Sequence, residues 1–137
     1  MTKNLLNKIK KKKISVCIIG LGYVGLPLAF RFLNAKIKVI GIDNDKSKLN
    51  KIKKGISYIE NKKFLKNNFY KDFQGNVSNN YSNVNKSDII ILCLPTPLNK
   101  NKKPDMSLLK SCINKIKKYV KLNQTLILES TVYPGAT

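Results

Sequence analysis

The chain has 137 residues, of which 42% are hydrophobic and 25% charged, and its formal net charge is +20. This length accommodates one domain with a single core, and two full domains would not fit. No apolar run approaches the roughly 18 residues that span a bilayer, and the basic start MTKNLLNKIKKKK does not resemble a secretory signal peptide. We therefore expect a cytoplasmic protein without a membrane partner.

The positive charge raises the possibility of nucleic-acid binding, because lysines neutralise phosphates without any further motif. Arg31 is the one arginine among 27 basic residues, whereas phosphate and base recognition favour arginine. The lysines are spread along the chain beside many asparagines and isoleucines, as codon bias in an AT-rich genome would produce. We expect no specific nucleic-acid partner, and we predict that residues 1–13 form a flexible, solvated basic arm.

From residue 14 onward, apolar runs of strand length alternate with segments of helical period. The expected strands are Ile14–Ile19, Ile37–Ile42, Ile89–Leu94 and Thr125–Glu129. The expected helices are Val24–Leu33, with Leu28 and Phe32 on its apolar face, Asp45–Lys54, and Met106–Val120, with an apolar stripe of Leu109, Cys112, Ile113, Ile116 and Val120.

The middle of the chain, from Asn61 to Asn85, is less regular. A short strand is predicted within Phe69–Val77, and NVSNNYSNVNKS is either a loop or a brief helix. The order of elements as a whole predicts an α/β domain with a Rossmann-type, doubly wound, mostly parallel sheet and helices on both faces.

Three glycines in GLGYVG stand between the first expected strand and the first helix. Gly20 permits a tight turn, Gly22 lets the backbone approach a pyrophosphate, and Gly25 lets the helix pack closely on the strand. The helix N-terminus then offers unpaired N–H groups to the phosphates. The carboxylate of Asp43, at the end of the second strand, would accept hydrogen bonds from the ribose hydroxyls. The alternative is an ordinary glycine turn with an unrelated surface aspartate.

Asp43 also favours NAD over NADP, because a carboxylate repels a 2′-phosphate. Lys48 either lies over the adenosine or is one more exposed lysine. Thr96 follows the fourth strand between two prolines, where it either faces the cofactor or caps a rigid turn. Ser130 and Thr131 follow the last strand and would lie near the nicotinamide. The expected cofactor contacts are Gly20, Leu21, Gly22, Tyr23, Val24, Gly25, Asp43, Lys48, Leu94, Pro95, Thr96, Ser130 and Thr131, and no metal site is expected.

Four segments together resemble the N-terminal NAD-binding domain of the UDP-glucose/GDP-mannose dehydrogenase family. They are GLGYVGLPLA at 20–29, GIDND with Lys48, LPTPL followed by PDMS, and the final ESTVYPGAT. SYIE at 57–60 and ESTVYPG at 129–135 are more similar to the branch that acts on UDP-N-acetylhexosamines. In this family the threonine that matches Thr131 belongs to the active site.

The resemblance implies oxidation of the C6 hydroxymethyl group of a nucleotide sugar to a carboxylate, at the expense of two NAD. The family's reactive cysteine captures the intermediate aldehyde and passes through a thioester, but it lies in central and C-terminal parts that no segment here matches. The three cysteines of this chain, Cys17, Cys93 and Cys112, are far apart in apolar surroundings and are expected to be buried structural thiols.

We therefore expect residues 14–137 to form a single truncated NAD-binding domain that is inactive alone and meets a UDP-sugar only together with the family's other domains. A gene fragment, half of a split enzyme and an excised domain all fit this expectation. Apolar surface left uncovered beside the last strand predicts association, either as a homo-oligomer or with a complementing C-terminal chain. The alternative function is a non-catalytic NAD-binding or sensing module.

Overall fold

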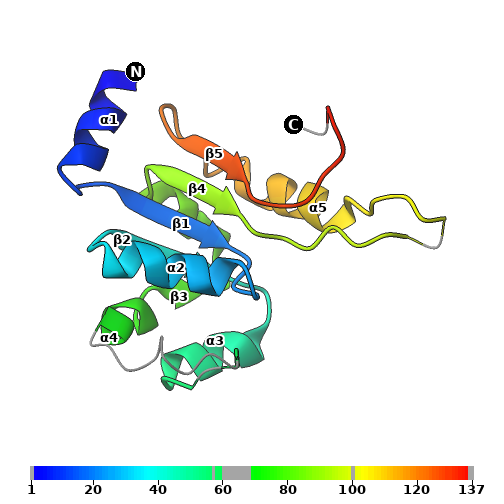
Figure 1. Cartoon of the computed structure of the whole chain (residues 1–137), viewed down its shortest axis with the longest axis horizontal. Coiled ribbons are helices and arrows are strands. Elements are labelled where there is room, and N and C mark those ends of the chain that lie inside the picture. The colour runs from blue at the N-terminus through cyan, green and yellow to red at the C-terminus, as the bar shows by residue number, and fades with distance from the viewer. Residues whose placement is uncertain (1, 57, 60–68, 100, 136–137) are drawn as a thin grey trace.

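The computed structural model describes residues 2–56, 58–59, 69–99 and 101–135, and within them it contains a five-stranded, wholly parallel sheet (Figure 1). The strand order is β3-β2-β1-β4-β5. The strands are β1 (Ser15–Ile19), β2 (Lys38–Ile42), β3 (Val77–Ser78), β4 (Ile89–Leu92) and β5 (Thr125–Leu128). The order reverses between β1 and β4, as in doubly wound nucleotide-binding folds. Of the SYIE segment, positions 57 and 60 lie outside the described residues.

Helices cover both faces of this sheet, because successive residues of the buried strands point to opposite sides. Val16 and Ile18 of β1 face one cluster and Cys17 and Ile19 the other. The first cluster is closed by α2 (Gly25–Asn34), α3 (Lys46–Lys53) and α4 (Phe69–Gln74), and the second by the 3-10 helix η2 (Tyr81–Lys86) and α5 (Ser107–Ile116). The predicted Rossmann-type α/β fold is confirmed.

Two segments differ from the elements that the sequence predicts. The strand expected within Phe69–Val77 is wrong for most of that range, since Phe69–Gln74 form α4 and β3 begins only at Val77. The helix carries Phe73 into the core, where its ring meets that of Phe30 edge-to-face with centroids 6.2 Å apart. At the N-terminus, Thr2–Lys10 form helix α1, where the sequence predicted a flexible arm.

The apolar faces of two helices are also narrower than predicted. In α5, Leu109, Cys112 and Ile116 are buried, but Ile113 is exposed, and Val120 is exposed beyond the end of the helix. In α2 the buried side chains are Leu26, Ala29, Phe30 and Leu33, and the predicted Leu28 and Phe32 are half-buried but pack against the same cluster. Each helix therefore turns a slightly different face to the sheet than its apolar periodicity indicates.

All five strands end at the same edge of the sheet, and this edge positions the loops that matter for function. The arrowheads of β1, β4 and β5 lie together in Figure 1, away from α1. The loops that begin at Gly20, Asp43, Cys93 and Glu129 therefore meet at the carboxyl ends of the strands, where open α/β sheets bind ligands. Among the described helices, none is both long and apolar enough to cross a bilayer.

Candidate nucleotide-binding site

The glycine loop lies between β1 and α2, and its three glycines meet different surroundings. Gly20 has φ +94°, and a Cβ there would overlap the carbonyl oxygen of Cys93. A Cβ on Gly25 would overlap the carbonyl oxygen of Gly20, so α2 can approach the loop only without a side chain at this position. Around Gly22 the space is open, with no atom within 4 Å of a built Cβ. This is the arrangement that a pyrophosphate needs at the N-terminus of α2.

Asp43 follows β2 directly and is tied to the glycine loop. Its Oδ2 accepts the Leu21 N–H at 2.7 Å, and its Oδ1 accepts the Asp45 N–H at 2.8 Å. The carboxylate is thereby held in one orientation beside the loop. An ionised carboxylate has about four lone-pair directions, so both oxygens retain capacity for ribose hydroxyls.

Leu21 has a buried side chain, and its backbone is engaged within the protein on both sides. Besides its N–H bond to Asp43, its carbonyl accepts the Tyr58 hydroxyl at 2.5 Å. The sequence predicts Leu21 among the cofactor contacts and offers Tyr58 only as part of a family motif. In the structure, Tyr58 and Asp43 together hold the glycine loop in place.

The remaining loop residues face outward. Tyr23 is 81% exposed, and Val24 is also exposed, so neither side chain is committed to the core. Lys48 is half-buried in the first turn of α3, where Asp45 caps the helix by accepting the N–H groups of Ser47 and Lys48.

A tyrosine that sequence reasoning missed lies beside the Asp43 loop. The Tyr81 hydroxyl donates to Asn44 Oδ1 at 2.8 Å, and the Lys115 ammonium lies 5.3 Å from the centre of the Tyr81 ring. Partial burial raises the pKa of the Tyr81 hydroxyl, and Cys112 and Asp43 nearby add to this. No sequence signal links positions 44, 81 and 115, since only the fold brings their loops together.

The loops after β4 and β5 are joined by two hydrogen bonds. The Thr96 hydroxyl donates to the Thr131 carbonyl at 2.5 Å, and the Ser130 hydroxyl donates to the Leu94 carbonyl at 2.8 Å. Thr96 thus fixes a backbone 35 residues away rather than capping its own turn. Leu94 also lies against Gly20, which links this pair of loops to the glycine loop. Pro95, between Leu94 and Thr96, is exposed.

All three cysteines are buried, as predicted. Burial raises the pKa of the Cys17 thiol to about 12 and the pKa values of Cys93 and Cys112 to about 11. A thiol with such a pKa holds almost no thiolate near neutral pH, and the thiolate is the nucleophilic form. In the part of the chain that the structure describes, no three His, Cys, Asp or Glu side chains gather as metal ligands would.

The doubly wound sheet and the glycine loop at its switch point define a dinucleotide-binding domain of the Rossmann type. Residues 14–137 match the profile described as "UDP-glucose/GDP-mannose dehydrogenase family, NAD binding domain". The chain belongs to this family, and NAD is its cofactor.

Individual relatives agree with this assignment. The chain is 37% identical to Protein CapL of Staphylococcus aureus over 123 residues, which cover 90% of this chain and 28% of CapL. It is 37% identical to a UDP-N-acetyl-D-glucosamine 6-dehydrogenase of Pseudomonas aeruginosa over 128 residues, 92% of this chain and 29% of the relative. The structure of a UDP-D-ManNAc dehydrogenase from Pyrococcus horikoshii superposes with a TM-score of 0.78 at 29% identity, covering 89% of this chain and 29% of that one. The chain thus spans less than a third of the length of these relatives.

Proposed function

We propose that this chain provides the NAD-binding domain of a UDP-N-acetylhexosamine 6-dehydrogenase. Such an enzyme oxidises the C6 hydroxyl of a UDP-sugar to a carboxylate with two NAD, a step that supplies precursors for polysaccharides. The observation that carries the proposal is the open space at Gly22 in the loop to which the Asp43 carboxylate is tied. The Leu21 N–H holds this carboxylate against the loop, and the Asp45 N–H orients it. The names of the relatives, which include dehydrogenases of UDP-N-acetylmannosamine and UDP-N-acetylglucosamine, support the sugar class.

In this proposal the glycine loop and the first turn of α2 bind the pyrophosphate through backbone N–H groups. Tyr23 and Val24 flank the phosphates, and Asp43 accepts the hydroxyls of the adenosine ribose. Lys48 lies over the same ribose from α3. The carboxylate of Asp43 repels the 2′-phosphate that distinguishes NADP, because both groups are negatively charged.

The loops after β4 and β5 serve the nicotinamide end. NAD, when bound, supplies the acceptor for a hydride from the sugar C6. Leu94, Pro95, Thr96 and Ser130 shape the floor of this end. The Thr96 hydroxyl fixes the Thr131 backbone, and the Ser130 hydroxyl joins the two loops through the Leu94 carbonyl. The exposed Thr131 hydroxyl then orients a water or another polar group near the reacting carbon.

The buried thiols favour a second candidate, a domain that binds NAD without chemistry of its own. No cysteine here serves as the thiol nucleophile that the four-electron oxidation uses, so a UDP-sugar reacts only when other residues of a dehydrogenase provide that thiol. The edge strand β5 exposes Leu126 and Ile127, which fits association with such a part or with a second copy.

Titration calorimetry of the 137-residue chain with NAD and NADP tests the proposal. We expect NAD to bind about 10-fold more tightly or better, because one unfavourable charge pair at a partly desolvated site is worth about 1.4 kcal/mol or more. Asp43→Ala should remove the preference, whereas Asp105→Ala, which changes another aspartate that caps a backbone N–H, should retain it. Equal or tighter binding of NADP by the unaltered chain would contradict the proposal that Asp43 selects NAD over NADP.

A further inference from the structure

Helix α1 carries an apolar stripe that the domain covers only on one side. Leu5, Leu6 and Ile9 share this stripe at helical spacing. Leu5 is half-buried and packs against the core, and Lys8 on the same side forms an ion pair of 2.6 Å with Asp88. On the other side Leu6 is 52% exposed and Ile9 is 42% exposed. The ion pair thus fixes α1 in an orientation that presents two apolar side chains to solvent.

Lysines stand at the last position of α1 and directly after the helix, next to Ile9 in the chain. Lys10, Lys11, Lys12 and Lys13 follow Ile9 without a break, and all four are exposed. Helices with a lysine-rich border and an exposed apolar face lie in membrane interfaces, where the apolar side chains enter the acyl boundary and the ammonium groups meet anionic headgroups.

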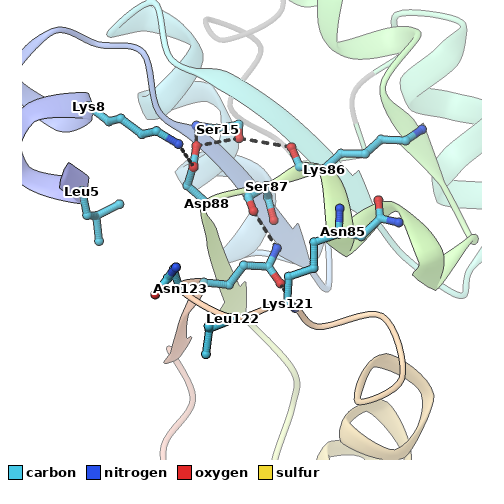
Figure 2. Close-up of a pocket in the computed structure, with 11 residues that line it drawn as sticks. Leu5, Lys8, Ser15, Asn85, Lys86, Ser87, Asp88, Lys121, Leu122 and Asn123 are labelled. Atoms are coloured by element: carbon cyan, nitrogen blue, oxygen red, sulfur yellow. Dashed lines mark hydrogen bonds and ion pairs between the residues drawn. The ribbon is translucent and has the colours of Figure 1, made fainter. Parts of the chain in front are cut away.

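A second apolar side chain with a lysine neighbour lies on the same end of the molecule. Leu122, in the loop that leads into β5, is 89% exposed and is preceded by the exposed Lys121. Leu5, Lys8 and Leu122 line one cavity of about 670 Å³, which lies between α1 and this loop (Figure 2). We call the exposed residues of both elements, Leu6, Ile9, Lys10–Lys13, Lys121 and Leu122, the amino-end surface.

The position of the amino-end surface separates it from the nucleotide site. It lies where β1 and β5 begin, whereas the glycine loop lies where β1 ends (Figure 1). Helix α1 also precedes the family match, which starts at residue 14. Occupation of the amino-end surface therefore leaves the nucleotide site accessible.

We propose that the amino-end surface docks on an anionic lipid bilayer, a role that goes beyond the proposed NAD-linked function and departs from the sequence-based expectation of no membrane partner. Charge complementarity selects this occupant, because an anionic bilayer offers both an apolar layer for Leu6, Ile9 and Leu122 and a negative surface for the lysines. Nucleic acid offers phosphates for the lysines but no apolar layer for Leu6, Ile9 and Leu122. A second copy that docked through the same surface would bring Lys10–Lys13 of both copies together, which opposes this particular contact.

Co-sedimentation of the full 137-residue chain with vesicles tests the docking. Vesicles of phosphatidylcholine alone are compared with vesicles that contain phosphatidylglycerol, at about 0.15 M salt, where attraction between exposed charges is screened beyond about 8 Å. We expect partitioning at least about 10-fold stronger on the anionic vesicles. The double variant Leu6→Ser with Ile9→Ser should weaken it about 10-fold. The matched control, Leu108→Ser with Ile113→Ser, removes two exposed apolar side chains from α5 and should leave it unchanged.

Insertion of the helix is read separately by fluorescence. The sequence contains no tryptophan, so Leu6→Trp provides a single reporter, and Leu108→Trp provides its control. We expect the tryptophan emission of the Leu6→Trp variant to shift to the blue with anionic vesicles and that of the control to stay unchanged. Circular dichroism and urea unfolding establish that each variant is folded.

Three results would overturn the docking. The first is equal partitioning of the unaltered chain on anionic and neutral vesicles. The second is vesicle binding that the Leu6→Ser and Ile9→Ser changes leave intact, which would reduce the effect to unspecific attraction by lysines. The third is an unshifted emission of the Leu6→Trp variant together with duplex DNA binding as tight as vesicle binding, which would assign the surface to nucleic acid.

Discussion

Gly22 and Gly25 lie three residues apart, yet one added methyl group should affect them in opposite ways. At Gly25 the new Cβ meets the carbonyl oxygen of Gly20, which is backbone and cannot rotate away. We expect Gly25→Ala to lower the free energy of unfolding by about 3 kcal/mol, at the upper end of the cost of overpacking. Gly22→Ala, where the space is open, should change it by less than about 0.5 kcal/mol. Urea denaturation of the pair checks this, and equal stability of the two variants would contradict the close approach.

Single residues of the site differ in how well the sequence predicts them. The glycine spacing and the acid after β2 identify the nucleotide loop. Each position of the glycine pattern has a known steric requirement, so the spacing alone is enough to predict it. The supporting hydrogen bonds could not be foreseen. Tyr58 reaches Leu21 across 37 positions and Thr96 reaches Thr131 across 35, and such partners depend on how loops lie over the sheet.

Among the elements, α1 offers a test by pH because the Asp88 carboxylate pairs with Lys8 of this helix. Burial alone would raise the pKa of Asp88, but hydrogen bonds from Lys8 and from the Ser15 N–H and hydroxyl outweigh it and hold the pKa below its usual value. A lowered native pKa stabilises the fold above the unfolded value of about 4, and this contribution is lost as the pH falls through the native pKa.

We therefore expect Asp88→Asn to destabilise the chain at neutral pH and to lose this disadvantage progressively below about pH 4. Urea unfolding of the unaltered chain and the variant over the acid range measures the difference. Lys8→Met should remove part of the same pH dependence while keeping an apolar stem against the domain. A difference between Asp88→Asn and the unaltered chain that stays constant with pH would show that Asp88 does not fasten α1 as an ion.

Elements with strong apolar periodicity were predictable, and those whose shape depends on distant packing were not. The continuous apolar runs of β1 and β4 are typical of strands buried on both faces, and both strands are found there. Within Phe69–Val77 the apolar pattern predicts a strand, but α4 forms there and brings Phe73 against Phe30. Helix α1 was missed because its few apolar residues stand among lysines, and its contact with Asp88 lies 80 positions away.

On the scale of the whole molecule, the proposal predicts that the 137-residue chain forms no NADH from UDP-N-acetylglucosamine or UDP-glucose. Its thiols are buried, and in the proposal other parts of a dehydrogenase hold the sugar C6 over the nicotinamide. Such positioning can account for roughly 7–11 kcal/mol of barrier lowering. NADH absorbance measures turnover. A thiol reagent at about pH 8 should label none of the three cysteines in the native chain and all of them in urea. Steady NADH formation from either UDP-sugar would contradict the proposal that the chain alone cannot oxidise a UDP-sugar.

The central claim is that NAD binds across the glycine loop, and calorimetric titration of Gly22→Val with NAD tests it most directly. The added side chain occupies space that is open in the folded chain, so the variant should fold with unchanged urea stability to within about 0.5 kcal/mol. We expect its NAD affinity to fall at least about 100-fold, since the valine fills the place of the pyrophosphate. Asn114→Val, on the exposed side of α5, serves as the control and should bind NAD as the unaltered chain does. Retention of full NAD affinity by folded Gly22→Val would contradict the account.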